Sequence, residues 1–171
     1  MRLSVIAVGA LLAAGLPPPG RAHTMPNSTV IIEASAPGRI ELAVAIPISE
    51  LEAAAPGVIS GDKARIQGFV REHVSVRGVD QRAWLGTLTR ATRDDGDHAL
   101  LKLSVRFTPS SGAASTPGQL HYDAIIDRIA SHYVLVYSRD GSRLRPLVRL
   151  QAPDTSVDLD GRPRTSGGKV E

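Results

Sequence analysis

Apolar and polar positions alternate with a period of two along much of the chain, which is the pattern of half-buried β-strands. The clearest run, residues 39–48, places four large apolar side chains on one face: Ile40, Leu42, Val44 and Ile46. A strand at residues 84–88 and another at residues 99–107 flank an acidic turn, so they predict a hairpin. Further strands are expected at residues 29–33, 120–126, 132–138 and 144–150, with a last short one at 156–159.

Two segments between these strands predict helices. Asp62 is a predicted N-cap for a helix at residues 63–76, whose apolar positions recur at helical spacing. A shorter helix is expected to end at Ala55, with Ser49 and Glu52 forming a capping box. About seven strands with one or two helical insertions predict a mainly β protein, an antiparallel β-sandwich of the Ig-like kind.

The two ends of the chain have a different pattern. The basic Arg2 precedes an apolar run at residues 3–16, and a Pro-Pro-Pro-Gly break with small residues at 20 and 22 follows. This is the layout of a secretory signal peptide at residues 1–22. We therefore expect a single domain at residues 23–159 that is periplasmic or secreted and has no membrane span after signal removal. Residues 160–171 have almost no apolar content and are expected to be a disordered tail.

Composition excludes several classes of function. The chain has no cysteine, which rules out disulfides, thiolate metal sites and cysteine nucleophiles. It carries 20 Lys and Arg against 17 Asp and Glu, and loss of Arg2 and Arg21 with the signal lowers the net charge from +3 to +1. No basic stripe with interleaved aromatic residues suggests nucleic acid binding. No phosphate-binding loop, dinucleotide fingerprint or Gly-x-Ser-x-Gly turn occurs, so we expect no enzyme.

Cleavage after residue 22 would make His23 the N-terminus, with an amine and an imidazole on one residue. Neutral nitrogen donors of this kind suit Cu(II), Ni(II) and Zn(II), but one residue leaves coordination positions open. His121 and His132 are the candidates to complete the site, because Asp123 shares a strand face with His121. By contrast His73 lies on the apolar stripe of the predicted helix and is expected to be a core residue.

Several short motifs resemble the N-terminal extracytoplasmic domain found in one branch of the HupE/UreJ family. They are AHTMPNS at residues 22–28, IPISELE at 46–52, FVREHV at 69–74, LHYDAI at 120–125 and Ser131-His132 before a β-run. The resemblance covers residues 23–159 and implies metal handling, because the family is associated with nickel or cobalt uptake. By position it points to His23, Asp123 and His132 as ligands. Full-length members carry their transport motif in membrane helices after this domain, so we expect no transport by the printed sequence alone, in which no window after residue 22 has the length and apolarity of such a helix.

The sequence therefore predicts an exported soluble domain that binds a divalent transition metal (nickel, cobalt or copper) in association with a membrane transporter. The predicted ligand set is His23, His132, His121 and Asp123. The alternative is a metal-free interaction domain that docks on an envelope or membrane partner, through an open strand edge or an exposed apolar patch.

Overall fold

The computed structural model describes residues 27–110 and 115–159. The predicted signal peptide, His23 and the predicted tail at residues 160–171 lie outside the described residues. The described helices are α1 (Ile48–Ala54) and α2 (Lys63–His73). The described strands are β1 (Ser28–Ala36), β2 (Arg39–Pro47), β3 (Val74–Gly78), β4 (Trp84–Asp94), β5 (Leu100–Pro109), β6 (Pro117–Tyr122), β7 (Val134–Asp140), β8 (Arg143–Leu150) and β9 (Ser156–Asp158). The prediction of a mainly β protein with helical insertions between strands is confirmed.

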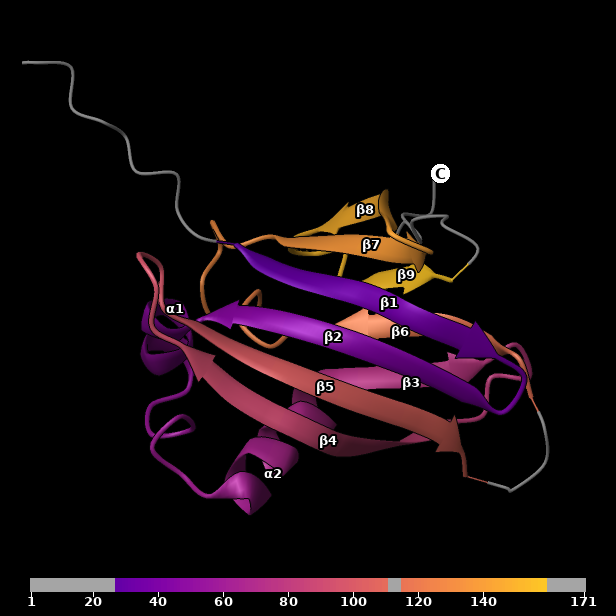
Figure 1. The fold of residues 1–171 in the computed structure, drawn as a ribbon, viewed down its shortest axis with the longest axis horizontal. Coiled ribbons are helices and arrows are strands. Elements are labelled where there is room, and N and C mark those ends of the chain that lie inside the picture. Colours follow the sequence, from indigo (N-terminus) through magenta and orange to yellow (C-terminus); the bar gives the residue numbers. More distant parts are fainter. Residues whose placement is uncertain (1–26, 111–114, 160–171) are drawn as a thin grey trace, which may run out of the picture.

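The strands form two sheets. Six strands pair in the order β4-β5-β2-β1-β7-β8, and three pair in the order β3-β6-β9. The smaller sheet lies behind the larger one, and α2 lies below β4, at the edge of the larger sheet (Figure 1). The predicted hairpin is confirmed as the antiparallel pair of β4 and β5. The pair of β1 and β7 is parallel, which differs from the expected antiparallel arrangement. The chain passes from β6 in the smaller sheet to β7 in the larger one, where Val134 lies opposite Ser28.

The core is built from the inward faces of the alternating strands. In β2 the four apolar residues that alternate in the sequence are all buried, from Ile40 to Ile46. They share one apolar cluster with residues of the smaller sheet, including Val76, Leu120 and Tyr122. Because Leu51 of α1 and Phe69 of α2 join the same cluster, both helices are held against the sheets by apolar burial.

The helix α2 is shorter than predicted. Asp62 caps it as expected and accepts a hydrogen bond from the Arg65 backbone N–H at 2.9 Å. The helix ends at His73, and the next residue begins β3, which pairs with β6 and places Val74 opposite Tyr122. The segment alternates buried and exposed residues with a period of two, which is the pattern of a strand. The described residues form nine strands instead of about seven, because β3 was missed and the short β9, expected at residues 156–159, is present.

The predicted capping box of α1 is wrong. The residue before the helix, Pro47, makes no side-chain cap hydrogen bond. Glu52 instead accepts a hydrogen bond from the Gly57 backbone N–H at 3.1 Å and thereby closes the turn that follows the helix. The Glu52 carboxylate, which was predicted to cap the start of α1, therefore stabilises the turn after its end.

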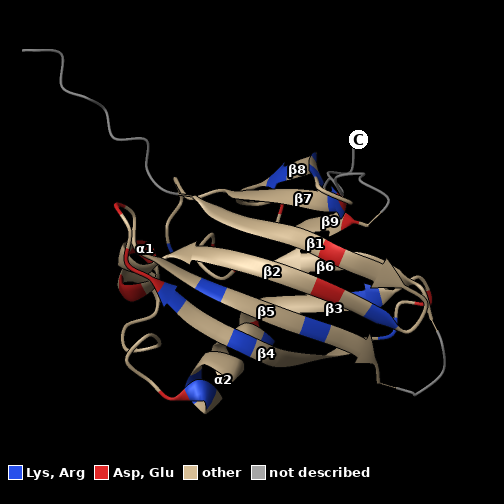
Figure 2. Ribbon diagram, in the orientation of Figure 1, with Lys and Arg blue, Asp and Glu red and all other residues tan. Residues whose placement is uncertain are grey.

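Charges on the large sheet are mixed in sign. Figure 2 shows acidic positions on β1 and β2 beside basic positions on β5 and β4. One such pair joins Arg106 of β5 to Glu41 of β2, with Nε 3.0 Å from Oε1. Among the residues described, no helix is both long enough and apolar enough to cross a membrane.

Candidate functional site

Two of the predicted ligands, His121 and Asp123, meet as expected. The Nε2 atom of His121 lies 3.1 Å from Oδ2 of Asp123. Tyr122, between them, is fully buried, so its two neighbours project to the other side of the chain. Both remain partly open to solvent, since 36% of the His121 side chain and 28% of the Asp123 side chain are exposed.

A third residue, His73, joins them from the end of α2. Its Nδ1 atom lies 2.8 Å from Oδ1 of Asp123, and 16% of its side chain is exposed. The pairing of β3 with β6 brings the helix end to the end of β6, where the Asp123 N–H donates to the His73 carbonyl at 3.1 Å. The prediction that His73 is only a core residue is therefore incomplete. After His73 the buried positions change from helical spacing to a period of two. This change is the sequence signal that could have placed His73 at the junction of α2 and β3.

We call His73, Asp123 and His121 the His121 cluster. Its outer end is held by β9, where Ser156 Oγ lies 3.0 Å from Nδ1 of His121. Each carboxylate oxygen of Asp123 thus faces one imidazole, and His121 uses both ring nitrogens. As they stand, no three or more His, Asp or Glu side chains within residues 27–110 and 115–159 could hold a metal ion. The cluster is a chain of hydrogen bonds in this structure.

The fourth predicted ligand, His132, belongs to a different network, which we call the His132 network. Its side chain is fully buried, Nδ1 bonds to Oε2 of Glu50, and Nε2 lies 2.9 Å from Oγ of Ser28. The backbone N–H of Ser28 also points at Nε2, at 3.3 Å. Because a backbone N–H can only donate, Nε2 is the acceptor and Nδ1 carries the proton that is donated to Glu50.

This geometry does not favour the predicted role of His132 as a metal ligand. Neither ring nitrogen has a free lone pair for a metal, and the side chain has no contact with solvent. Burial lowers the pKa of His132, although the neighbouring Glu50 carboxylate acts in the opposite direction. The neutral ring therefore links the starts of β1 and α1 to the segment before β7.

The Ser28–His132–Glu50 chain has the connectivity of a serine-hydrolase triad. Ser28 is fully buried, however, so no substrate can reach its hydroxyl in this structure. Burial also raises the pKa of the nearby Tyr122, while the Ser28 hydroxyl acts to lower it. Among the described residues the Tyr122 hydroxyl has no hydrogen-bond partner that meets geometric criteria. We therefore assign the His132 network to fold stability.

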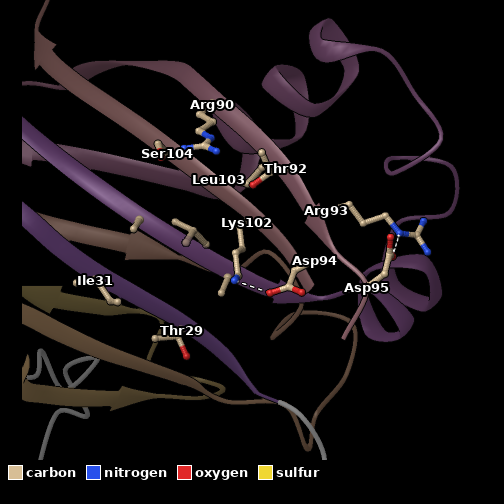
Figure 3. Close-up of a pocket in the computed structure, with 13 residues that line it drawn as sticks. Thr29, Ile31, Arg90, Thr92, Arg93, Asp94, Asp95, Lys102, Leu103 and Ser104 are labelled. Carbon is tan, nitrogen blue, oxygen red and sulfur yellow. Dashed lines mark hydrogen bonds and ion pairs between the residues drawn. The ribbon is translucent and has the colours of Figure 1, made fainter. Parts of the chain in front are cut away.

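Two of the open cavities in the described part of the chain bear on function. Figure 3 shows the larger one, about 600 Å³, on the outer face of β1, β2, β5 and β4. Two of its cations are paired, since Lys102 Nζ lies 2.5 Å from Asp94 Oδ2 and Arg93 bonds to Asp95. The Lys102 hydrogen bond also lowers the pKa of Asp94. A smaller cavity, about 330 Å³, borders His73.

Comparison with known proteins adds no identity to this geometry. The sequence matches no family model, and no curated protein matches it. The resemblance to the HupE/UreJ domain therefore stays a prediction.

Proposed function

We propose that this chain is an exported domain that binds a divalent transition metal, nickel, cobalt or copper, at the His121 cluster. The observation that supports this is the Asp123 carboxylate, which is flanked by two imidazoles at a solvent-accessible position. Carboxylate oxygen and imidazole nitrogen are ligands that these metals share. His73 takes the place that the sequence analysis gave to His132.

The hydrogen bonds of the cluster have lengths compatible with a coordination sphere. Ligands about 2.0–2.2 Å from one metal ion lie about 2.8–3.5 Å from one another in octahedral or tetrahedral geometry. The two nitrogen–oxygen distances at Asp123 are 2.8 and 3.1 Å. Because the two imidazoles face different oxygens of Asp123, both rings would have to turn toward one metal ion, with loss of the shared protons, to form a ligand set.

The hydroxyl of Ser156 is compatible with the form of His121 that a metal requires, because a hydroxyl can accept a hydrogen bond as well as donate one. If Nδ1 donates its proton to the Ser156 Oγ atom, 3.0 Å away, the lone pair of Nε2 faces Asp123 and is available to a metal. Hydrogen bonds of this kind fix the tautomer and orientation of metal-binding histidines. The cluster thus contains two nitrogen donors, one carboxylate and an orienting hydroxyl.

The proposal keeps the wider predictions from the sequence. We propose that the two facing sheets are an Ig-like β-sandwich, that the domain acts in the periplasm, and that it passes metal to a membrane transporter. His23 would add its terminal amine and imidazole as a second binding group. The remaining open coordination positions at the His121 cluster would suit transfer of the ion to a partner.

The test is calorimetric titration of Ni(II), Co(II), Cu(II) and Zn(II) into exported protein shown by mass spectrometry to begin at His23. Because Asp123 bridges the two rings, we expect Asp123→Asn to weaken binding at least tenfold, an effect of the size seen for metal-site substitutions. His98→Ala is the matched control, since His98 is exposed beside the acidic turn. A sample with one residue added before His23 separates the terminal group from the cluster. Equal affinities for the Asp123 and His98 variants would contradict the proposal.

The alternative, a metal-free interaction domain, has one favourable observation. The cavity of Figure 3 crosses four strands of the large sheet and has a floor of small side chains, including Ala43, Ala45 and Ser104. A partner that lies across this face would meet no bulky obstacle. Capture of a membrane partner that persists in chelator and is lost in an Ala45→Arg variant would favour this function.

A further inference from the structure

The smaller cavity, beside His73, has the size and lining of a site for a small organic molecule. Its volume of about 330 Å³ is at the lower end of the range for ligand pockets. It lies between the end of α1, the outer side of α2 and the turn that follows β6. The lining residues come from these three segments, so the pocket depends on the tertiary structure.

The cavity has an apolar part and a charged rim. The apolar part consists of Ala54, Ala55, Val58, Phe69 and Ala124. The rim consists of Arg65, Glu72, His73 and Arg128. The lining surface is more polar than apolar, and Val58, Phe69 and Ala124 are themselves largely buried, so the cavity has room for one short apolar chain beside its charged rim.

Arg65 is the cation that a ligand would meet. Its guanidinium forms no ion pair with any described residue, whereas Arg128 is paired with Asp127 at 3.2 Å. The side chain of Arg65 lies along two glycines, and a Cβ atom at Gly61 would be 2.5 Å from its Cδ atom. Because these glycines leave room for the side chain, the backbone positions the guanidinium at the rim.

We propose that this cavity binds a small monocarboxylate, with its apolar chain against Phe69 and Val58 and its carboxylate on the Arg65 guanidinium. A guanidinium binds a carboxylate through two parallel hydrogen bonds, which gives Arg65 both charge and shape complementarity. Glu72 on the same rim disfavours a second carboxylate. The proposal is independent of metal binding, although His73 borders both the cavity and the His121 cluster.

The test is an NMR titration of the ¹⁵N-labelled exported chain with hexanoate, in buffer that contains a chelator. We expect saturable shifts of the backbone amides of Phe69, His73 and Ala124. Hexanol, which has the same chain without the charge, should produce no comparable effect. Because a charged hydrogen-bonded pair is lost, Arg65→Ala should weaken hexanoate binding about tenfold.

Two further variants make the result specific. Arg93→Ala removes an equal charge from the cavity of Figure 3 and should leave hexanoate affinity unchanged. Glu72→Gln should strengthen binding of adipate, a dicarboxylate of similar length, several-fold. Absence of saturable shifts, equal shifts with hexanol, or equal affinities of the Arg65 and Arg93 variants would overturn the proposal. Loss of metal binding alone would leave it intact.

Discussion

Two histidines of this protein have the same kinds of partner in opposite surroundings. His132 lies between the Glu50 carboxylate and the Ser28 hydroxyl, and His121 lies between the Asp123 carboxylate and the Ser156 hydroxyl. The first side chain is fully buried, and 36% of the second is exposed. A carboxylate–histidine–serine chain therefore does not by itself define a functional site.

The two networks differ in their access to solvent, and this access determines whether a ligand can reach the histidine. At His132 the backbone N–H of Ser28 fixes the proton on Nδ1, and burial keeps the ring neutral. At His121 no backbone group fixes the tautomer, and a second imidazole shares the carboxylate. The buried network is held in one protonation state, whereas the exposed one is open to solvent and is the site at which we propose that a metal ion replaces the shared protons.

The largest difference in stability should come from removal of the two imidazole rings, one at a time. His132→Ala would leave Glu50 and Ser28 buried without their shared partner and open a void in the core. We expect it to lower the free energy of unfolding by about 3 kcal/mol. His121→Ala should cost less than about 1 kcal/mol, because water can replace its hydrogen bonds. Urea denaturation of both variants checks this, and equal losses would show that the two networks contribute alike to stability.

A smaller effect is expected from pH. The pKa of His132 in the folded protein is lowered below its ordinary value of 6.5, so the unfolded chain binds a proton more readily. Stability should therefore be complete above about pH 6.5 and be lost as the pH falls toward the pKa of the folded state. Urea denaturation between pH 7.5 and pH 5 measures this loss. His132→Gln, which cannot titrate, should show a shallower decline, and an unchanged slope would contradict the assignment.

The smallest effect should come from the hydroxyls. Ser28→Ala removes a buried hydrogen bond to Nε2 of His132, while the Ser28 backbone N–H remains as a partner. We expect a loss of about 1 kcal/mol. Ser156→Ala should change stability by less than about 0.5 kcal/mol, since Thr155 Oγ1 also lies within 3.3 Å of His121. Thermal unfolding followed by circular dichroism can rank the two variants, and the reverse order would refute the comparison.

The site was predictable in part. That His121 and Asp123 share a side followed from their separation of two residues, and the structure confirms it. The role of His73 was not predicted because Val74 continues the apolar spacing of α2 by one residue, and the two-residue spacing of β3 becomes visible only beyond it. Pairing with β6 then brings His73 to Asp123. The buried contacts of His132 with Glu50 and Ser28 were not predicted, because burial of a polar side chain is not visible in a local pattern.

The sequence by itself determined most of the strands, the approximate position of both helices and the buried face of a strand such as β2, because these depend on periodicity between near neighbours. It did not determine β3 or the exact end of α2. The tertiary structure decided which polar groups meet. Ser28 and Glu50 are 104 and 82 residues from His132 in the chain, and His73 is 50 residues from Asp123. Contacts over such separations are set by sheet order and register, and no local pattern encodes whether a histidine at the contact is closed in the core or open to a ligand.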